Sequence, residues 1–242
     1  MTRTGVDTRQ LQERAVTGGI LGVGSAKGDL IVYNGTTHQR REVGGDGTAL
    51  LADSGTTHGL RWGIPWAWDH VSYIAVPTAM SSVDFTGTEI DGQNGEYLIC
   101  FEGVSMDTDG VELALRLHEN NASWRNGTSD YSWSNDGSST GVNLGFSDTG
   151  DSEMALTTTG SYRPGSAPDE SLSGWVHIYR PTDSNLRTLC RWNTVYVNLN
   201  GEQTIVYGVG MRTTGEINDG FRIFPKSGNL HSGTFTLYQR LS

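Results

Sequence analysis

Apolar and polar residues alternate with a period of two along most of the chain beyond residue 70. In the segment 111–119, Val111, Leu113, Leu115 and Leu117 fall on one face of an extended chain, and the residues between them fall on the other. Gly, Asn and Asp residues separate such segments and indicate turns. The pattern predicts β-strands over residues 72–76, 95–106, 111–119, 153–159, 174–180, 186–199, 204–212, 220–224 and 233–241.

The alternation within 194–199 predicts that Val195, Val197 and Leu199 point into the core. Strands that are apolar on one face belong to antiparallel sheets with the other face in water. Eight or nine such strands without intervening helical segments favour two sheets packed face to face. The predicted fold class is therefore all-β, with an antiparallel, jelly-roll-like β-sandwich over residues 70–242.

One short helix is predicted near the N-terminus, over residues 7–16 (DTRQLQERAV). Asp7 or Thr8 can cap it, and Leu11 and Val16 share one face. A helix this short is marginal in water on its own, so we expect it to pack on a larger particle or a sister chain. We therefore treat residues 1–25 as an anchoring segment, with Leu11 and Val16 as its candidate contact residues.

Between residues 26 and 62, short apolar runs alternate with turn-forming residues. Four motifs follow one another there: GDL at 28–30, VGGDG at 43–47, ADS at 52–54 and GLRW at 59–62. Their order and spacing resemble a module of tailed-bacteriophage fibre proteins. That family carries an apolar residue and Leu-Pro where this chain has Arg40 and Arg41. The resemblance implies a Gly-rich fibre or collar module over residues 26–69, with Leu30 and Val32 among its oligomerisation candidates.

Three tryptophans lie at the end of this module. Trp62, Trp66 and Trp68 are two or four residues apart, which places their indoles on one side of an extended segment. A hydrophobic seam against a neighbouring element or subunit is one interpretation, and it makes all three further oligomerisation candidates. Stacking on a sugar is the alternative.

The closing segment adds a second resemblance. Residues 227–238 (SGNLHSGTFTLY) are similar to the terminal strand of phage fibre and receptor-binding sandwiches, with Gln239 in place of that family's final Gly. Together the two resemblances imply a virion fibre or spike that forms a homotrimer and is attached to other virion proteins through its N-terminus. Association of identical copies suits a chain with 35% hydrophobic residues and 33 Gly, because Gly lets backbones approach closely near an axis.

The charge is acidic and unevenly distributed. The formal net charge is −10; residues 1–62 hold seven Lys/Arg and six Asp/Glu, whereas residues 63–242 hold ten and twenty-one. Such a surface repels phosphate backbones and anionic membranes, so no nucleic-acid partner is expected. The first fifteen residues lack the apolar core of a signal peptide, and no later run reaches the length of a membrane span, so no membrane insertion is expected either.

Two cysteines, Cys100 and Cys190, each lie in an apolar strand-like run. We interpret them as small core residues, and a disulfide between them requires that their strands be neighbours. No spacing of Cys and His residues indicates zinc. Calcium could bind carboxylate oxygens of Asp107, Asp109 and the acidic residues of 148–153. These residues lack the spacing of an EF-hand loop, so we favour the interpretation that they are solvated carboxylates in turns. No cofactor is therefore expected.

Residues 120–174 form a long polar interruption between predicted strands. Aromatic residues among Asn, Ser and Asp suit a carbohydrate, which offers CH faces for stacking and hydroxyls for hydrogen bonds. The alternative is that Tyr131 and Trp133 alternate within a strand and pack inward. The glycan-contact candidates are Trp124, Asp130, Tyr131, Trp133, Asn135, Asp136 and Tyr162.

The sequence offers no convincing catalytic set. The six histidines are scattered singly, and the glycines at 22 and 24 lack the preceding strand of a dinucleotide site. We therefore expect a non-enzymatic virion protein, a fibre or spike on the phage particle surface that binds a host-surface glycan. The alternatives are a head-attached fibre or capsid decoration protein, and a glycan-cleaving tailspike enzyme.

Overall fold

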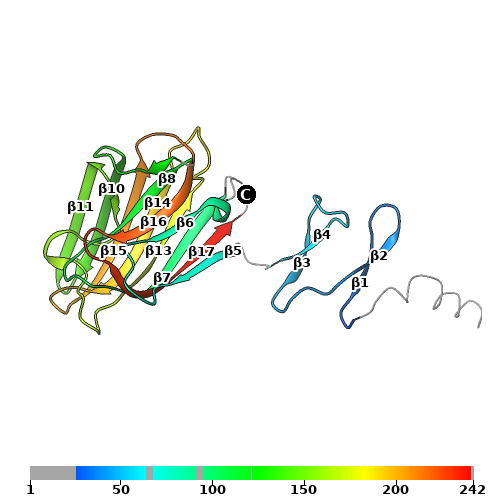
Figure 1. Cartoon of the computed structure of the whole chain (residues 1–242), viewed down its shortest axis with the longest axis horizontal. Coiled ribbons are helices and arrows are strands. Elements are labelled where there is room, and N and C mark those ends of the chain that lie inside the picture. The colour runs from blue at the N-terminus through cyan, green and yellow to red at the C-terminus, as the bar shows by residue number, and fades with distance from the viewer. Residues whose placement is uncertain (1–25, 64–67, 91–94, 121, 241–242) are drawn as a thin grey trace, which may run out of the picture. The chain divides into compact units, whose positions relative to one another are not determined.

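The computed structural model describes residues 26–63, 68–90, 95–120 and 122–240 (Figure 1). The chain divides into two compact units, residues 1–67 and 68–242. The helix predicted over 7–16, with Leu11 and Val16, lies outside the described residues, and so does Trp66.

In the first unit, the described residues 26–63 form two small antiparallel hairpin-like pairs. Strand β1 (Leu30–Tyr33) pairs with β2 (His38–Arg41), and β3 (Ala49–Ala52) pairs with β4 (Leu60–Gly63). None of residues 26–63 is buried. Four large apolar side chains of this segment are more than a third exposed: Ile31, Tyr33, Val43 and Leu50. Two-stranded pairs are marginally stable in water, and residues 26–63 form no buried interior that could hold the two pairs together.

The second unit is built from two antiparallel sheets. The larger contains β5 (Asp69–Ala75), β7 (Glu96–Met106), β10 (Tyr131–Ser139), β11 (Val142–Asp151), β13 (Leu172–Tyr179), β14 (Leu189–Val197), β15 (Gln203–Arg212) and β17 (Leu230–Arg240). These eight strands lie in the order β11-β10-β15-β14-β13-β7-β17-β5. The smaller contains β6 (Val83–Thr86), β8 (Leu113–Glu119), β9 (Ser123–Trp124), β12 (Met154–Ala155) and β16 (Asn218–Pro225). Its order is β12-β8-β16-β6, and β9 pairs with β8.

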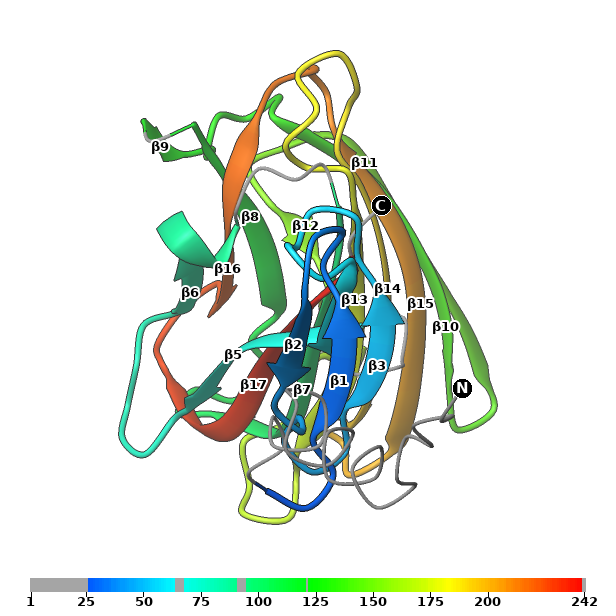
Figure 2. The ribbon, with the colours of Figure 1, turned by 90° about the vertical axis from the view of Figure 1, so that its right-hand side faces the viewer.

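The two sheets face one another and enclose a single core, as Figure 2 shows with β6, β8 and β16 opposite the larger sheet. Tyr97 of the larger sheet meets Phe221 of the smaller one at a ring-centroid distance of 5.3 Å. Both side chains are fully buried, and burying such large apolar groups is the main force that holds a sandwich together. Two 3₁₀ turns, Gly87–Glu89 and Gly160–Tyr162, complete the described elements.

The alternating segments predicted the strands well. The chain is an antiparallel β-sandwich, as expected, and each predicted segment overlaps an observed strand. Strands β6, β9, β10 and β11 of the sandwich lie outside the predicted segments, and the last three fall within the predicted polar interruption 120–174. Leu113, Leu115 and Leu117 are fully buried, and Val111 is 6% exposed, so their predicted inward face is confirmed.

The predicted orientation of β14 is wrong. Val195 is 40% exposed and Leu199 37%, whereas Thr194, Tyr196 and Asn198 point inward. The reason is that the irregular segment 155–162 brings backbone groups into the interior, and these need hydrogen-bonding partners. Thr194 Oγ1 donates to the carbonyl of Leu156 at 2.9 Å.

Tyr196 serves the same segment. Its hydroxyl accepts a hydrogen bond from the amide of Thr158 at 3.1 Å and contacts the carbonyl of Tyr162 at 3.1 Å. Burial raises the pKa of Tyr196 to about 12, so the hydroxyl keeps its proton at neutral pH. The inward polar side chains Thr194 and Tyr196 therefore hold the segment 155–162 in place by hydrogen bonds. The alternation of apolar and polar residues in the sequence does not reveal this role.

The two cysteines are not bonded to one another. Strand β13 lies between β7, which carries Cys100, and β14, which carries Cys190. Cys190 is buried in the core, and Cys100 is half-buried. Burial raises the pKa of both thiols, which makes them unreactive at neutral pH.

Candidate binding face of the eight-stranded sheet

Three of the glycan-contact candidates lie in the interior. Tyr131 is 0% exposed, Asn135 2% and Trp133 6%, so none of them can stack on a ligand from solvent. The Tyr131 hydroxyl accepts from the amide of Leu117 at 2.8 Å, and Trp133 Nε1 donates to a carboxylate of Asp151 at 3.1 Å. The glycan-contact prediction is wrong for these three, and the alternative, inward packing along a strand, is what the structure has.

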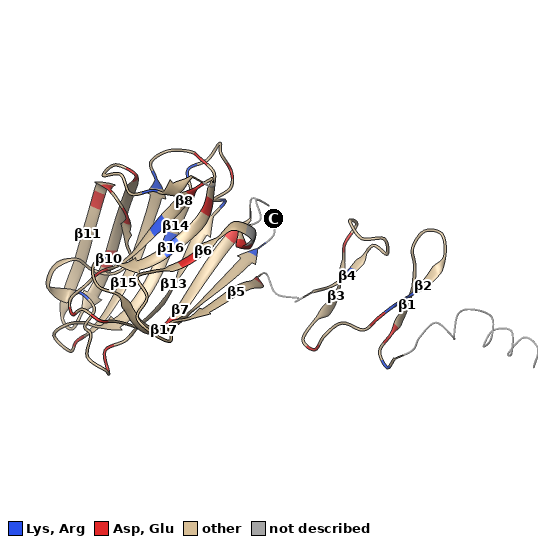
Figure 3. Cartoon of the chain, in the orientation of Figure 1, with Lys and Arg blue, Asp and Glu red and all other residues tan. Residues whose placement is uncertain are grey.

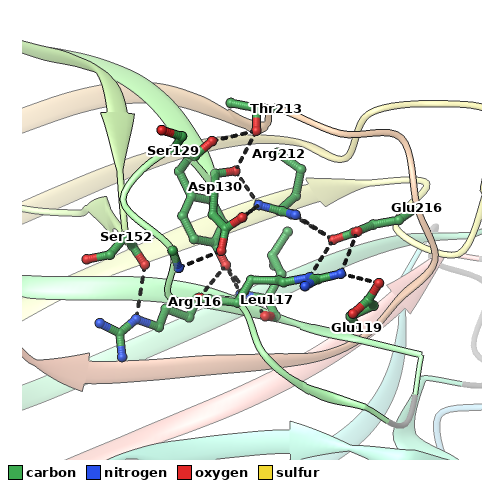
Figure 4. A network of polar contacts seen from close by, with 12 residues as sticks. Arg116, Leu117, Glu119, Ser129, Asp130, Ser152, Arg212, Thr213 and Glu216 are labelled. Carbon is green, nitrogen blue, oxygen red and sulfur yellow. Dashed lines mark hydrogen bonds and ion pairs between the residues drawn. The ribbon is translucent and has the colours of Figure 1, made fainter.

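Asp130 belongs to a network of ion pairs around a buried arginine (Figure 4). The Arg212 side chain is 2% exposed; its Nη1 lies 3.2 Å from Asp130 Oδ1 and its Nη2 lies 2.7 Å from Glu216 Oε1. Arg125 contacts the second oxygen of Glu216 at 3.1 Å and also pairs with Glu119. Burial alone would raise the pKa of Glu216, but the hydrogen bonds from the two arginines hold it below its ordinary value. The network joins the ends of β8 and β15 to the connecting segments 125–130 and 213–217, so Asp130 has a structural role.

Trp124 lies on the outer face of the smaller sheet, where its ring is already in contact with protein. The Arg222 guanidinium is centred 4.2 Å from the Trp124 ring centroid, and the His118 ring lies 5.0 Å away. Arg222 also makes a bidentate pair with Asp84 at 2.8 and 2.6 Å, and His118 Nδ1 lies 2.7 Å from Asp219. The aromatic and charged groups of this cluster therefore satisfy one another.

A second cluster extends the same pattern. Glu153 receives Arg116 Nη2 at 2.7 Å and Lys226 Nζ at 2.9 Å, although Glu153 itself is only 5% exposed. Burial would raise the pKa of Glu153, but its hydrogen bonds to Ser152, Lys226 and Arg116 outweigh that effect and lower it. We refer to the two clusters together as the paired face.

Tyr162 is half-buried in the second 3₁₀ turn, and its carbonyl accepts from Thr158 Oγ1 at 2.6 Å. Asp136, in contrast, is exposed at the middle of β10 on the outer face of the larger sheet. In the strand register, Asp136 lies opposite Tyr207 of β15. The same cross-strand row continues through Asn193 of β14 to Trp175 of β13. Asp136 is thus the candidate that the structure places beside exposed aromatic residues.

A shallow concavity of about 450 Å³ occupies this part of the sheet. Figure 2 shows the strands that form it, β10, β15, β14 and β13, side by side. It is lined by Ser134, Asp136, Trp175, Arg191, Trp192, Tyr207, Gly208 and Val209.

Two neighbouring concavities lie on the same outer face of β10 and β15. One of about 320 Å³ shares Ser134 and Val209 with the first and extends to Ser132 and Met211. The other, of about 480 Å³, lies at the β10–β11 turn and includes Ser138 and Ile205. We name the three concavities together the outer trough.

The outer trough exposes both apolar and polar groups. Val209 is 60% exposed and Tyr207 is 57% exposed. The Arg191 guanidinium lies 5.1 Å from the ring centroid of Trp175. None of the ion pairs of the described chain includes Arg191 or Asp136. Figure 3 shows the acidic residues of the sandwich distributed over strands and connecting loops. The trough therefore offers a carboxylate and a guanidinium that can hydrogen-bond to a ligand, and it places them beside exposed aromatic rings. A small polar ligand needs this combination of groups.

The periodicity analysis missed Trp175, Arg191 and Tyr207. A signal for Tyr207 was present in its neighbours, because Gly208 and Gly210 occupy the inward positions of β15. A Cβ on Gly208 would lie 2.0 Å from Cε2 of the buried Trp192. The inward glycines leave room for core side chains, so the large residues of this strand face outward.

No protein-family model matches the chain, and no curated protein or solved structure matches it. Among the described residues, no three His, Cys, Asp or Glu side chains are grouped in a way that could hold a metal ion. No helix in the described part of the chain is long and apolar enough to cross a membrane.

Proposed function

We propose that this protein is a non-enzymatic phage fibre or spike that attaches the particle to a host cell through a surface glycan. The observation that carries the proposal is the outer trough, where the exposed Tyr207 lies beside unpaired Asp136 and Arg191. A concavity that combines aromatic and apolar side chains with a few polar groups is typical of a ligand-binding site. The sequence resemblance of residues 26–62 and 227–238 to phage fibre proteins supports a location on the virion.

The proposed oligomer is a homotrimer held together in part by the first unit. Residues 26–63 include no buried residue, yet they expose Ile31, Tyr33 and Leu50. Contact with identical copies would remove this apolar surface from water, which would stabilise the hairpin-like pairs. Leu30, Val32, Trp62 and Trp68, all half-buried, are available for further burial in such contacts.

A jelly-roll tip is the architecture that we propose for the sandwich. Strands β5, β7, β13 and β17 lie side by side in the larger sheet, and β6, β8, β12 and β16 make up the smaller one. Successive strands of this set alternate between the sheets except for β8 and β12, which follow one another in the smaller sheet. This order supports the two Greek keys of a jelly roll. The residues before 26 would attach the fibre to other virion proteins.

Adsorption to cells tests the proposed function. Labelled full-length protein is incubated with a panel of bacterial strains and with mutants of each that lack surface polysaccharide. We expect binding to at least one strain and loss of binding in its polysaccharide-deficient mutant. Absence of binding to every strain, or equal binding to the mutants, would contradict a glycan receptor. Immunogold labelling of the phage particle would then separate a tail location from a head location.

Light scattering tests the oligomer independently. The full chain of 26.2 kDa should give the mass of three copies. A concentration-independent mass of one copy would refute the homotrimer without affecting the adsorption result.

A further inference from the structure

The three concavities of the outer trough lie in one line along a single pair of strands. In the register of β10 and β15, Ser132 lies opposite Met211, Ser134 opposite Val209, and Ser138 opposite Ile205. The six-residue distance from Ser132 to Ser138 corresponds to about 20 Å at the rise of a β-strand. A site of this length exceeds what one sugar ring can cover.

We propose that the outer trough binds an uncharged oligosaccharide of several sugar units, which lies along β10 and β15; this inference rests on the proposed glycan-binding function. The two strands offer different chemistry. The outward residues of β10 are hydroxyl or carboxylate groups, namely Ser132, Ser134, Asp136 and Ser138. Those of β15 are apolar or aromatic from Ile205 through Tyr207 and Val209 to Met211, and the strand begins with the exposed amide of Gln203.

This division matches the surface of a sugar chain. A pyranose ring presents CH groups on its faces and hydroxyls at its edge. A chain that lies between the two strands can stack a ring face on Tyr207 while its hydroxyls donate to Asp136. Trp175 and Arg191 border the same concavity and can contact a ring on the other side of Tyr207.

The charges of the trough favour an uncharged ligand. One carboxylate, Asp136, and one guanidinium, Arg191, line the central concavity, and they balance. The remainder of residues 63–242 carries an excess of acidic residues, which repels a polyanionic glycan at long range. Recognition of an acidic polymer would need a group of unpaired cations, whereas Arg191 is the cation among the residues that line the three concavities.

The charges also argue against a second copy of this chain as the occupant. A subunit contact over the trough would remove Asp136 and Arg191 from water, and neither has an ion-pair partner. Burying an unpaired charge is unfavourable because the lost hydration is not replaced, which opposes a dry interface. A hydroxylated ligand, in contrast, can hydrogen-bond to both groups.

The test uses polysaccharide extracted from a strain that adsorbs the protein, cut by partial acid hydrolysis into fractions of increasing length. Full-length wild type, Tyr207→Ala and Tyr73→Ala are titrated with each fraction by calorimetry. Tyr73 is the matched control, because it is also 57% exposed and lies in the same cross-strand row, at the opposite edge of the sheet. We expect longer fractions to bind more tightly, with a loss of about tenfold in Tyr207→Ala, the equivalent of one stacking contact, and less than about twofold in Tyr73→Ala.

Each other result has a defined meaning. Equal affinity of wild type and Tyr207→Ala, no gain with length, or retention of fractions that carry uronic acid or phosphate would overturn the trough assignment while leaving adsorption intact. A changed light-scattering mass of Tyr207→Ala would identify the face as a subunit interface and also overturn it. Failure of the protein to adsorb to any strain would refute the proposed function itself.

Discussion

The two outer faces of the sandwich use polar residues in opposite ways. On the paired face, Arg222 contacts both Asp84 and Trp124, and the buried Glu153 receives two cations. In the outer trough, Asp136 and Arg191 have no ion-pair partner within the described chain. The charged side chains of the paired face already pair with one another, so few of them are available to bind a ligand.

This difference separates stability from binding. Removing a residue of the paired face leaves another charged group without its partner, which lowers the free energy of unfolding. Removing an exposed residue of the trough disturbs few internal contacts, so its effect should appear in ligand affinity. The predictions below test this separation, from the largest expected effect to the smallest.

The largest effect is expected beneath the trough, at Gly208. A Cβ there would lie 2.0 Å from the Trp192 ring, and Trp192 is 1% exposed, so the ring cannot move aside into solvent. Gly208→Ala should lower the free energy of unfolding by about 3 kcal/mol, measured by urea denaturation. Gly215→Ala is the control, because the nearest atom to its Cβ would be at 3.4 Å. Equal stability of the two variants would show that the floor of the trough is not tightly packed.

Glu153→Ala tests the paired face. The substitution removes the carboxylate that pairs with Arg116 and Lys226, both of which are partly solvated, so we expect a loss of about 2 kcal/mol in the free energy of unfolding. Asp136→Ala should leave the unfolding midpoint unchanged because no internal ion pair is lost. If Asp136→Ala were the more destabilising of the two, the contrast between the faces would be wrong.

Two tryptophans provide a matched pair across the faces. Trp124→Ala removes the ring that Arg222 and His118 contact, which should cost about 1 kcal/mol of stability without weakening adsorption to cells. Trp175→Ala should weaken adsorption about fivefold and have the smaller effect on stability. Thermal unfolding and cell binding of both variants show whether each tryptophan contributes to stability or to adsorption. Weakened adsorption in Trp124→Ala would place a second glycan contact on the paired face.

The smallest effect on stability is expected from a change of pH, and the pH range differs between the two outer faces. His177 lies two residues from Trp175 on the same face of β13. Burial lowers the pKa of His177 below its ordinary value of 6.5; Glu96 opposes this shift, and Arg191 and Arg240 add to it. The unfolded chain therefore takes up the proton first, and this contribution to stability is present above pH 6.5 and lost as the pH falls toward the folded-state pKa. His177→Gln should reduce the fall in melting temperature over that window.

Glu153 acts at lower pH. Its pKa lies below the ordinary value of 4.5, so the stability that it contributes is present above pH 4.5 and is lost as the pH falls through the folded-state pKa. Glu153→Gln should flatten the acid limb of the melting curve and leave the region near pH 6 unchanged. A single acid transition that neither substitution alters would show that other groups govern both windows.

Local pattern located most strands of the sandwich, but it missed β10 and β11 and did not assign every face. Leu113, Leu115 and Leu117 could be assigned to the core because alternation and burial coincide in β8. In β14, Thr194 and Tyr196 face inward because they hydrogen-bond to the segment 155–162, which is distant in sequence. Periodicity cannot detect such partners.

The same limit applies to the candidate site. The sequence by itself determined the antiparallel sandwich and a pool of aromatic and polar residues within 120–174, because strand alternation and composition are local properties. Only the tertiary structure decided that Tyr131 and Trp133 are core residues and that Asp136 lies in a row with Tyr207 and Trp175. That row joins strands far apart in the chain, and their pairing depends on how two sheets close over one core rather than on any short segment.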